Sequence, residues 1–300
     1  MNIYLPLEVQ QRELDARVYL AANLAALGHT AYFGHKSNLF PQIKKLKPGV
    51  FIHKSIQIRK IKQILLLKDL GHVNLAFDEE ALMIPDIKAY FNWRASRKCL
   101  SAVDQFFTWG KYDYNLFVKQ YPDLSEKVKI GGNSRIDVLS DQSRFLEEAN
   151  YIKAKHGKFV LFITKFARYN LKKRGWDTFL EMTKANNPNV SAESVQKIEQ
   201  SVLFEEKNMI SLQNVIKKLA TTHPDLKIII RPHPAEDHEK WISFSNTLNQ
   251  ENVLVDSDNS NSVVPWILAA HKVISHNCTT SIESFGLGIS SGTFISFRDA

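Results

Sequence analysis

Residues 227–234 of this 300-residue chain read KIIIRPHP. A β-branched run typical of a buried strand stops at a rigid corner, in which Pro232 and Pro234 restrict the backbone on both sides of His233. Residues 273–283, VISHNCTTSIE, repeat the arrangement, because a short apolar strand runs into a hydroxyl-rich turn that opens a helix. Ligands of open parallel sheets bind outside the carboxyl ends of the strands. The two segments therefore predict a parallel α/β sheet with a binding site at that edge.

Strand-like and helix-like segments alternate through the first half of the chain. We predict strands at residues 3–7, 31–33, 49–53, 73–77, 105–109 and 127–130. Helices are predicted at residues 14–25 and 56–70, ended by Gly28 and Gly71. This alternation is typical of a parallel sheet with helices on both faces.

A polar helical stretch at residues 142–156 leads into a new strand, which indicates a domain boundary near residue 150. The second half repeats the pattern, with strands at residues 159–164, 226–230, 252–255 and 272–275 and helices at residues 212–220, 237–248 and 263–270. Residues 185–207 are polar and are expected to form a surface insertion. We predict two Rossmann-like α/β domains, residues 1–150 and 151–300, facing a cleft. Residues 294–297 read as a last strand with nothing after it, so the C-terminal domain is expected to be incomplete.

Composition limits the class of protein. The chain is 44% apolar and 23% charged, which is typical of a globular protein with a sizeable core. It has no signal peptide and no apolar run near the ~18 residues that span a bilayer, so a cytoplasmic location is expected. Cys99 and Cys278 fit a reducing compartment and form no zinc pattern.

The net charge of +8 indicates an anionic partner. Patterns of RRM domains, zinc fingers and helix-turn-helix motifs are absent from the sequence, so nucleic acid is not the expected partner. A phosphorylated ligand fits the charge, and so does peripheral contact with the inner membrane. Walker A, HExxH, GxSxG and GxGxxG signatures are also absent from the sequence.

The corner after residue 230 supplies two groups suited to phosphate. Arg231 can bind a phosphate bidentately, and His233 can donate a hydrogen bond to a phosphate oxygen. A Pro-stiffened loop with a purely structural His is the alternative.

The turn after residue 275 supplies hydroxyl groups where a helix should begin. Backbone N–H groups at a helix N-terminus favour an anion, so Thr279, Thr280 and Ser281 are candidates for phosphate binding. Glu283 can accept hydrogen bonds from ribose hydroxyls. Ordinary N-capping and a capping-box partner are the structural alternatives.

Acidic residues follow the strand at residues 73–77. Asp78 and Glu79 are candidates for a general base, or for a nucleophile toward an anomeric carbon. A solvated acidic turn is the alternative.

Two further groups in the first half are candidates for acceptor binding. Glu8, Arg12 and Glu13 follow the first strand, where a salt-bridged turn is the alternative. Asn133 and Arg135 follow a Gly-Gly pair that lets the backbone approach a ligand, or that serves as a hinge between the halves.

Five motifs in this order resemble the bacterial surface carbohydrate biosynthesis proteins, over residues 3 to about 290. They are residues 5–15, 77–80, 132–137, 231–234 and 276–283. These proteins look like members of the wider GT-B group, which includes capsule-type Kdo transferases, His-Pro-motif sialyltransferases and CDP-glycerol glycerophosphotransferases. Residues 105–110, QFFTWG, are also similar to a Gln-xxx-Trp-Gly signature of capsule Kdo transferases.

The resemblance implies a role for several of these residues. His233 would contact the donor phosphate or nucleotide, and His276 belongs to the motif that holds the phosphate through Thr279, Thr280 and Ser281. Asp78 or Glu79 would take the acid/base position.

We therefore expect a glycosyltransferase of bacterial surface polysaccharide biosynthesis. It would use a nucleotide-activated donor, with a CMP-linked acidic sugar as first choice, and a glycan or lipid-linked glycan acceptor, and it would need no metal or other cofactor. A CDP-glycerol-type phosphopolyol transferase and a sugar-nucleotide 2-epimerase are the alternatives among enzymes. A non-catalytic carbohydrate-binding subunit is the alternative from another class.

Overall fold

The computed structural model describes residues 1–8, 10–79, 84, 87–171, 181, 192–258, 261–276, 278–294 and 296. Within helices, the side chains of residues 11, 12, 89, 93 and 194 lie outside this description. The chain divides into two compact units, Met1–Asp141 and Gln142–Ala300. The division precedes helix α8 (Ser143–His156) because α8 packs against α12 (Val264–Ala269) of the second unit. A boundary at residue 150 would fall inside α8.

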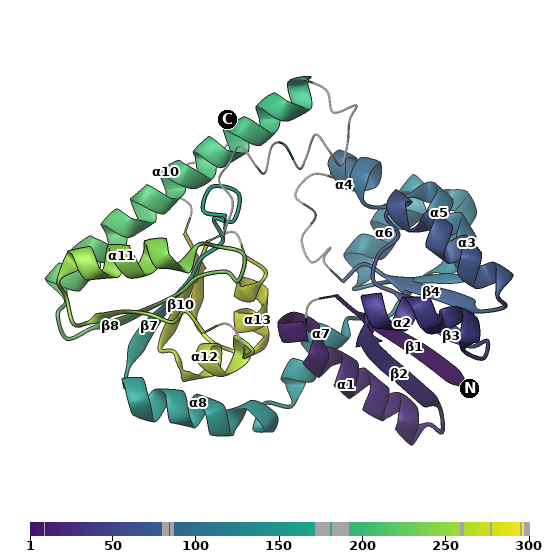
Figure 1. The fold of residues 1–300 in the computed structure, drawn as a ribbon, viewed down its shortest axis with the longest axis horizontal. Coiled ribbons are helices and arrows are strands. Elements are labelled where there is room, and N and C mark those ends of the chain that lie inside the picture. Colours follow the sequence, from purple (N-terminus) through teal and green to yellow (C-terminus); the bar gives the residue numbers. More distant parts are fainter. Residues whose placement is uncertain are drawn as a thin grey trace. The chain divides into compact units, whose positions relative to one another are not determined.

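The first unit contains a six-stranded parallel sheet in the order β2-β1-β3-β4-β5-β6 (Figure 1). Its strands are β1 (Asn2–Leu7), β2 (Thr30–His35), β3 (Val50–His53), β4 (Val73–Phe77), β5 (Gln105–Thr108) and β6 (Val128–Ile130). The chain passes from β1 to β2 on one side and then returns to β3 on the other side of β1. The strand order therefore reverses between β1 and β3.

Helices cover both faces of this sheet, as the period-two alternation of side chains requires. Ile3 and Leu5 pack with Ala21 of α1, whereas Tyr4 packs on the opposite face with Leu67 of α3. The helices of the unit are α1 (Gln10–Ala26), α2 (Lys36–Gln42), α3 (Ile61–Asp69), α4 (Ile87–Trp93), α5 (Arg97–Ala102), α6 (Lys111–Gln120) and α7 (Ser134–Asp137).

The second unit contains a five-stranded parallel sheet in the order β11-β10-β7-β8-β9. Its strands are β7 (Phe159–Ile163), β8 (Lys227–Arg231), β9 (Val253–Val255), β10 (Lys272–Ser275) and β11 (Ser291–Thr293). All five residues of β7 are buried, which explains the uninterrupted apolar run in this central strand. The strand order of this sheet reverses between β7 and β10.

Besides α8 and α12, the described helices of the second unit are α10 (Ala192–Thr222), α11 (His238–Leu248) and α13 (Thr280–Gly286). Within the surface insertion expected at residues 185–207, residues 192–207 form the first half of the 31-residue helix α10. Apolar residues of α10, such as Leu212 and Ile216, are fully buried toward its second half, whereas much of the first half is solvent-facing. Residues 185–191 lie outside the described part of the chain.

The two Rossmann-like parallel α/β units predicted from the sequence are confirmed, and the interdomain cleft stays a prediction. The predicted bounds match β4 and β10, and Gly28 and Gly71 adopt the positive φ of helix ends, both at 81°. The strand expected at residues 294–297 instead occupies Ser291–Thr293, while residues 295 and 297 are not described. Across the described helices, none combines the length and apolarity that a bilayer span would need.

Candidate functional site

In the second unit, the candidate residues lie at the carboxyl ends of β7, β8 and β10, which are neighbours in the sheet. The strand order reverses between β7 and β10, and open α/β sheets bind ligands outside the strand ends beside such a reversal. Thr164 and Phe166 follow β7, His233 follows β8, and His276 follows β10. Both sequence segments that predicted the sheet therefore end at its carboxyl edge.

A buried carboxylate, Glu236, connects two of these strand ends. Its side chain is 0% exposed and accepts five hydrogen bonds. Oε1 accepts from Thr164 Oγ1 at 2.8 Å, from the Phe166 N–H at 3.1 Å and from the His233 N–H at 3.2 Å. Oε2 accepts from Trp241 Nε1 at 2.9 Å and from Asn170 Nδ2 at 3.4 Å. Glu236 thus fixes the loops after β7 and β8 relative to each other.

His233 is half-buried within a tight turn held by its own backbone. The Ala235 N–H donates to His233 Nδ1 at 3.1 Å, and the His233 carbonyl lies 3.1 Å from His238 Nε2. Because Nδ1 accepts a hydrogen bond, the neutral imidazole carries its proton on Nε2. The turn therefore presents His233 as a hydrogen-bond donor through Nε2, the form that suits a phosphate oxygen.

His276 lies at the reversal point and is 2% exposed. Its ring stacks on Phe166, with centroids 4.2 Å apart and planes at 22°, and it forms a hydrogen bond with the backbone of Lys165. Burial lowers the pKa of His276 to about 4, so the ring is neutral at pH 7. Its Nδ1 has no hydrogen-bond partner among the described residues, and neither has the hydroxyl of the adjacent buried Ser275.

The hydroxyl groups of Thr280 and Ser281, in the turn after β10, contact other atoms of the same turn. Thr280 Oγ1 lies 3.0 Å from Cys278 Sγ, and Ser281 Oγ donates to the Cys278 carbonyl at 2.9 Å. Thr279 occupies the N-cap of α13 without a side-chain capping bond, and Glu283 lies in the first turn of that helix. The structure brings these four predicted residues together beside His276, with the Thr280 and Ser281 hydroxyls engaged in the turn. Asn277 lies outside the described residues.

The side chain of Arg231 contacts other residues of the second unit, which the sequence did not suggest. It forms an ion pair with Asp256, and its Nη2 donates to the Asn261 carbonyl at 3.0 Å. Its side chain is 4% exposed, and its guanidinium lies over the Trp266 ring at 5.4 Å. Burial lowers the pKa of Arg231 while Asp256 opposes this, and a guanidinium stays charged. This arrangement ties β8 to the chain after β9, and phosphate binding by Arg231 stays a prediction.

The second unit also contains one Asp-x-Asp sequence, Asp256-Ser257-Asp258, a pattern that can bind a metal ion. Asp256 is the carboxylate that pairs with Arg231. Burial raises the pKa of Asp256, and the Arg231 charge opposes this. Asp256 therefore has a structural partner in this arrangement.

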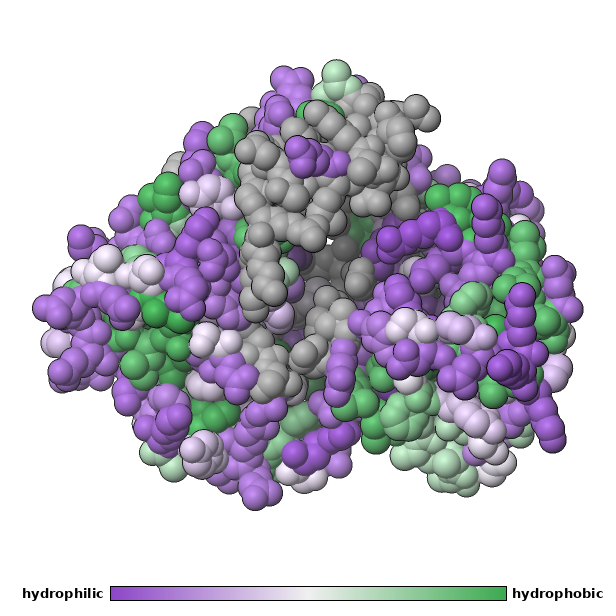
Figure 2. Space-filling view, in the orientation of Figure 1, coloured by the Kyte–Doolittle hydropathy of each residue, from purple (hydrophilic) through white to green (hydrophobic). Residues whose placement is uncertain are grey.

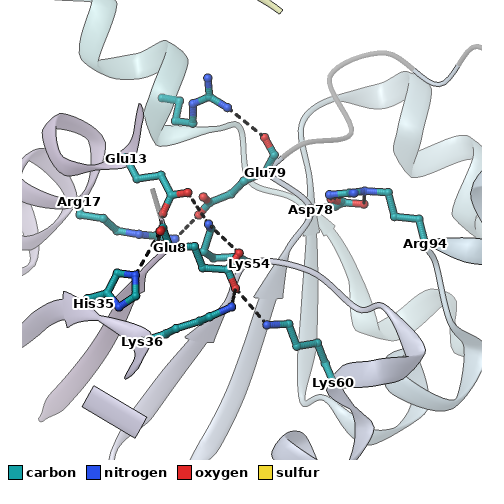
Figure 3. Close-up of polar contacts among 11 residues, drawn as sticks. Glu8, Glu13, Arg17, His35, Lys36, Lys54, Lys60, Asp78, Glu79 and Arg94 are labelled. Carbon is teal, nitrogen blue, oxygen red and sulfur yellow. Dashed lines mark hydrogen bonds and ion pairs between the residues drawn. The ribbon is translucent and has the colours of Figure 1, made fainter. Parts of the chain in front are cut away.

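In the first unit, charged side chains fill the edge at the reversal point between β1 and β3 (Figure 3). Glu8 follows β1 and Lys54 follows β3. Lys54 pairs with Glu13 and lies 3.4 Å from Glu8 Oε2, while Lys36 and Lys60 lie 3.0 and 3.1 Å from Glu8 Oε1. Partial burial raises the pKa of Glu8, but the three lysines outweigh it and lower that pKa to about 2.

Glu79 joins this network from the end of β4. It forms an ion pair with Arg17, which is 2% exposed, and its carbonyl accepts from Arg135 Nη1 at 3.5 Å. Burial raises the pKa of Glu79, although Arg17 and Lys54 oppose the effect. A buried carboxyl with a raised pKa is suited to general acid/base work. The structure thus brings together Glu8, Glu13, Glu79 and Arg135 of the predicted residues.

Asp78 turns away from this network. Its carboxylate receives a bidentate pair from Arg94, at 2.6 and 2.9 Å, and a hydrogen bond from the Tyr90 hydroxyl at 2.9 Å. It is 2% exposed, and its carbonyl accepts from Trp109 Nε1 at 2.7 Å. These contacts give Asp78 a structural role, and its alternative role as a base stays a prediction. Glu80 lies outside the described residues.

Asn133 caps helix α7, since its Oδ1 accepts from the Arg135 N–H at 2.9 Å. It is 4% exposed, and its Nδ2 has no partner among the described residues. The side chain of Arg12 is not described, so its predicted role stays a prediction.

Sequence reasoning missed Glu236, Arg17, Lys54, Lys60 and Phe166. Lys54 stands directly after a predicted strand, and Glu236 stands two residues after the Arg-Pro-His-Pro corner, so the strand-end rule offered a signal for both. Phe166 also follows a predicted strand, at residues 159–164, whereas Arg17 and Lys60 gave no such signal because their partners lie on other elements.

No protein-family model matches the chain, and no curated protein matches its sequence. Solved structures do match its fold. A UDP-GlcNAc 2-epimerase from Neisseria meningitidis, bound to UDP-GlcNAc, matches with a TM-score of 0.63 at 14% identity, over 97% of this chain and 82% of that one. A putative UDP-N-acetylglucosamine 2-epimerase from Listeria monocytogenes matches with a TM-score of 0.60 at 10% identity, over 99% and 80%. The wall teichoic acid polymerase TagF matches with a TM-score of 0.51 at 11% identity, over 97% and 69%. At these identities the similarity establishes the fold, a pair of Rossmann-like units of GT-B type.

Proposed function

We propose that the protein is a glycosyltransferase of bacterial surface polysaccharide biosynthesis, which binds a nucleotide-activated sugar at the carboxyl edge of the second sheet. One observation carries this proposal: His276 Nδ1 is a buried nitrogen at the reversal point of that sheet, and it has no hydrogen-bond partner among the described residues. Burying a polar atom without a partner is costly, so such atoms commonly await a ligand or a water molecule. A hydroxyl or amino group of the nucleotide would complete the hydrogen bonding of His276.

The neighbouring groups suit the phosphate of such a donor. His233 offers a donor through Nε2 from a turn fixed by Glu236. Thr279 stands at the start of α13, where backbone N–H groups favour negative charge. During transfer, negative charge grows on the leaving phosphate, and preorganised donors stabilise it most when they need no rearrangement.

The acceptor would bind to the first unit. There Glu79 has the raised pKa that a general acid/base requires, whereas Asp78 is held by Arg94 and Tyr90. We therefore assign proton transfer at the acceptor hydroxyl to Glu79. The acceptor is a glycan or lipid-linked glycan in this proposal, the reaction is cytoplasmic, and no metal takes part.

A sugar-nucleotide 2-epimerase is the second candidate. It is favoured by the TM-scores of 0.63 and 0.60 to structures of that activity, compared with 0.51 for the polymerase. The two candidates share the donor site and differ in whether a second substrate is consumed.

Product analysis separates the candidates. The protein is incubated with CMP-, CDP- and UDP-linked donors, with and without a mixture of bacterial surface glycans, and products are identified by mass spectrometry. Sugar added to a glycan, with little donor turnover in its absence, is the expected result. Release of an epimer without a glycan would replace the transferase proposal by the epimerase, and an inactive Glu79→Gln variant that stays folded would support the acid/base assignment.

A further inference from the structure

The positive charge of the protein is concentrated in one segment of the first unit. Residues 36–68 contain nine Lys and Arg residues and no Asp or Glu, namely Lys36, Lys44, Lys45, Lys47, Lys54, Arg59, Lys60, Lys62 and Lys68. The whole chain has a net charge of +8, so the remaining residues together carry a charge of −1. This segment forms α2, β3 and α3 with the turns between them.

Part of this basic segment lines an open pocket of about 420 Å³. Lys36, Arg59 and Lys60 supply its charge, Ser37 and Gln63 its neutral polar groups, and Phe40 and Pro41 an apolar wall. The volume falls within the range of small-molecule sites and exceeds what a single phosphate fills. Figure 2 shows hydrophilic side chains interspersed with apolar ones over the face that carries α2 and α3.

The carboxylates near the pocket do not neutralise it. Lys36 and Lys60 share one oxygen of Glu8, and Lys54 pairs with Glu13 and contacts Glu8 (Figure 3). Arg59 is exposed and has no ion-pair partner in the part of the chain that the structure describes. Among the described side chains in these contacts, four cations thus stand against two carboxylates, which gives them a net charge of +2.

We infer that the Lys36–Arg59–Lys60 pocket binds a phosphate group of the acceptor, and this inference rests on the proposed transferase function. A net charge of +2 matches a phosphate monoester dianion or a diphosphate better than a single carboxylate. Arg59 can bind phosphate bidentately, and Lys36 and Lys60 can each add a charged donor. The apolar wall of Phe40 and Pro41 would contact the group that carries the phosphate.

The pocket adjoins the reversal point of the first sheet through Glu8. Lys36 and Lys60 line the pocket and also contact Glu8, which follows β1 at the reversal point. An acceptor phosphate in the pocket would therefore anchor a ligand whose remainder extends along this edge toward Glu79.

Titration calorimetry with pyrophosphate tests the inference on the full chain. Binding should weaken by roughly tenfold or more in Arg59→Gln, because one bidentate charged contact is lost. Lys62→Gln is the matched control, since it removes one positive charge from the start of α3 without lining the pocket. Equal weakening in both variants, or no binding to the wild type, would overturn the inference. Unchanged thermal unfolding of both variants would show that the fold is intact.

Vesicles distinguish the source of the phosphate. Sedimentation with phosphatidylcholine vesicles, with and without phosphatidic acid, measures recognition of a lipid phosphate. Arg59-dependent binding that requires phosphatidic acid supports a lipid-linked acceptor, whereas pyrophosphate binding alone supports a soluble phosphorylated one. Vesicle binding that Lys62→Gln weakens as much as Arg59→Gln would contradict a specific pocket. Nucleotide binding at the second unit should survive in Arg59→Gln, so failure of the pocket and failure of the donor site remain separable.

Discussion

The carboxylate of Glu236 accepts a hydrogen bond of 2.8 Å from the hydroxyl of Thr164. Thr164 follows β7 and Glu236 lies in the loop after β8, so this contact joins two strand ends at the carboxyl edge of the second sheet. The same oxygen accepts the N–H of His233, which fixes the turn that presents its imidazole. Glu236 is therefore a positioning residue for the candidate donor site.

Replacement of Glu236 by Ala should destabilise the second unit by about 3 kcal/mol or more, because five donors, most of them buried, lose a shared acceptor. Trp241 donates to Glu236, so its fluorescence during thermal unfolding follows the affected region. Glu251→Ala removes an exposed carboxylate from the same unit and should leave the melting temperature almost unchanged. Equal melting of all three proteins would contradict the role of Glu236.

The two Asp–Arg forks of the first unit provide a matched pair of tests. Asp78 is 2% exposed in its pair with Arg94, whereas the Asp123 side chain is 56% exposed in its pair with Arg97. Asp78→Ala should cost about 3–5 kcal/mol because it removes the bidentate acceptor of a partly buried guanidinium. Asp123→Ala should have a small effect, since solvent screens an exposed pair. Calorimetric melting temperatures compare them, and similar losses would show that Asp78 is not a structural anchor.

The strand and helix pattern could be predicted from the sequence because local signals agreed with the fold. Buried parallel strands such as β7 are uninterrupted apolar runs, and Gly71 marks the end of α3 through its positive φ. The early start of α10 could not be predicted in this way. Its first half is polar and shows less of the apolar periodicity that marks a helix against a core.

The sequence predicts which residues lie at the candidate site but not which partners their side chains have. Strand ends identify which residues reach the edge of a sheet, and this located His233, His276 and Glu79. Which partner each charge takes depends on the three-dimensional neighbours. Phosphate binding by Arg231 stays a prediction, and no sequence pattern indicated its ion pair with Asp256, 25 residues away. Spacing in sequence carries no information about such pairs.

Arg231→Lys should lower the melting temperature of the second unit while preserving nucleotide binding. A lysine keeps the charge but cannot reproduce the planar fork that meets both Asp256 and the Asn261 carbonyl. Thermal unfolding with and without nucleotide measures both effects. Loss of nucleotide binding in a variant with wild-type stability would instead assign Arg231 to the phosphate.

His53 should make the stability of the first unit depend on pH. It is 3% exposed, its Nε2 lies 2.8 Å from Asn74 Oδ1, and burial lowers its pKa from 6.5 to about 4. The unfolded chain then binds a proton between pH 6.5 and 4 that the folded chain does not, so the contribution of His53 to stability falls as the pH falls.

The comparison with His53→Gln isolates this effect. The stability advantage of the wild type over the variant should shrink by about 1.4 kcal/mol per pH unit below pH 6.5. Urea unfolding of both proteins from pH 7 to pH 5 measures the difference. A constant advantage over that range would mean that His53 is not held neutral by burial.

Nucleotide binding at the edge formed by β7, β8 and β10 can be measured by thermal shift with CMP, CDP, UDP and GDP. We expect at least one nucleotide to raise the melting temperature, since a ligand at 100 times its Kd adds about 2.7 kcal/mol. We expect this shift to disappear in His233→Ala and to persist in His223→Ala, which changes an exposed histidine of the same unit. Absence of a shift with all four nucleotides, or an unchanged shift in His233→Ala, would contradict a donor site at this edge.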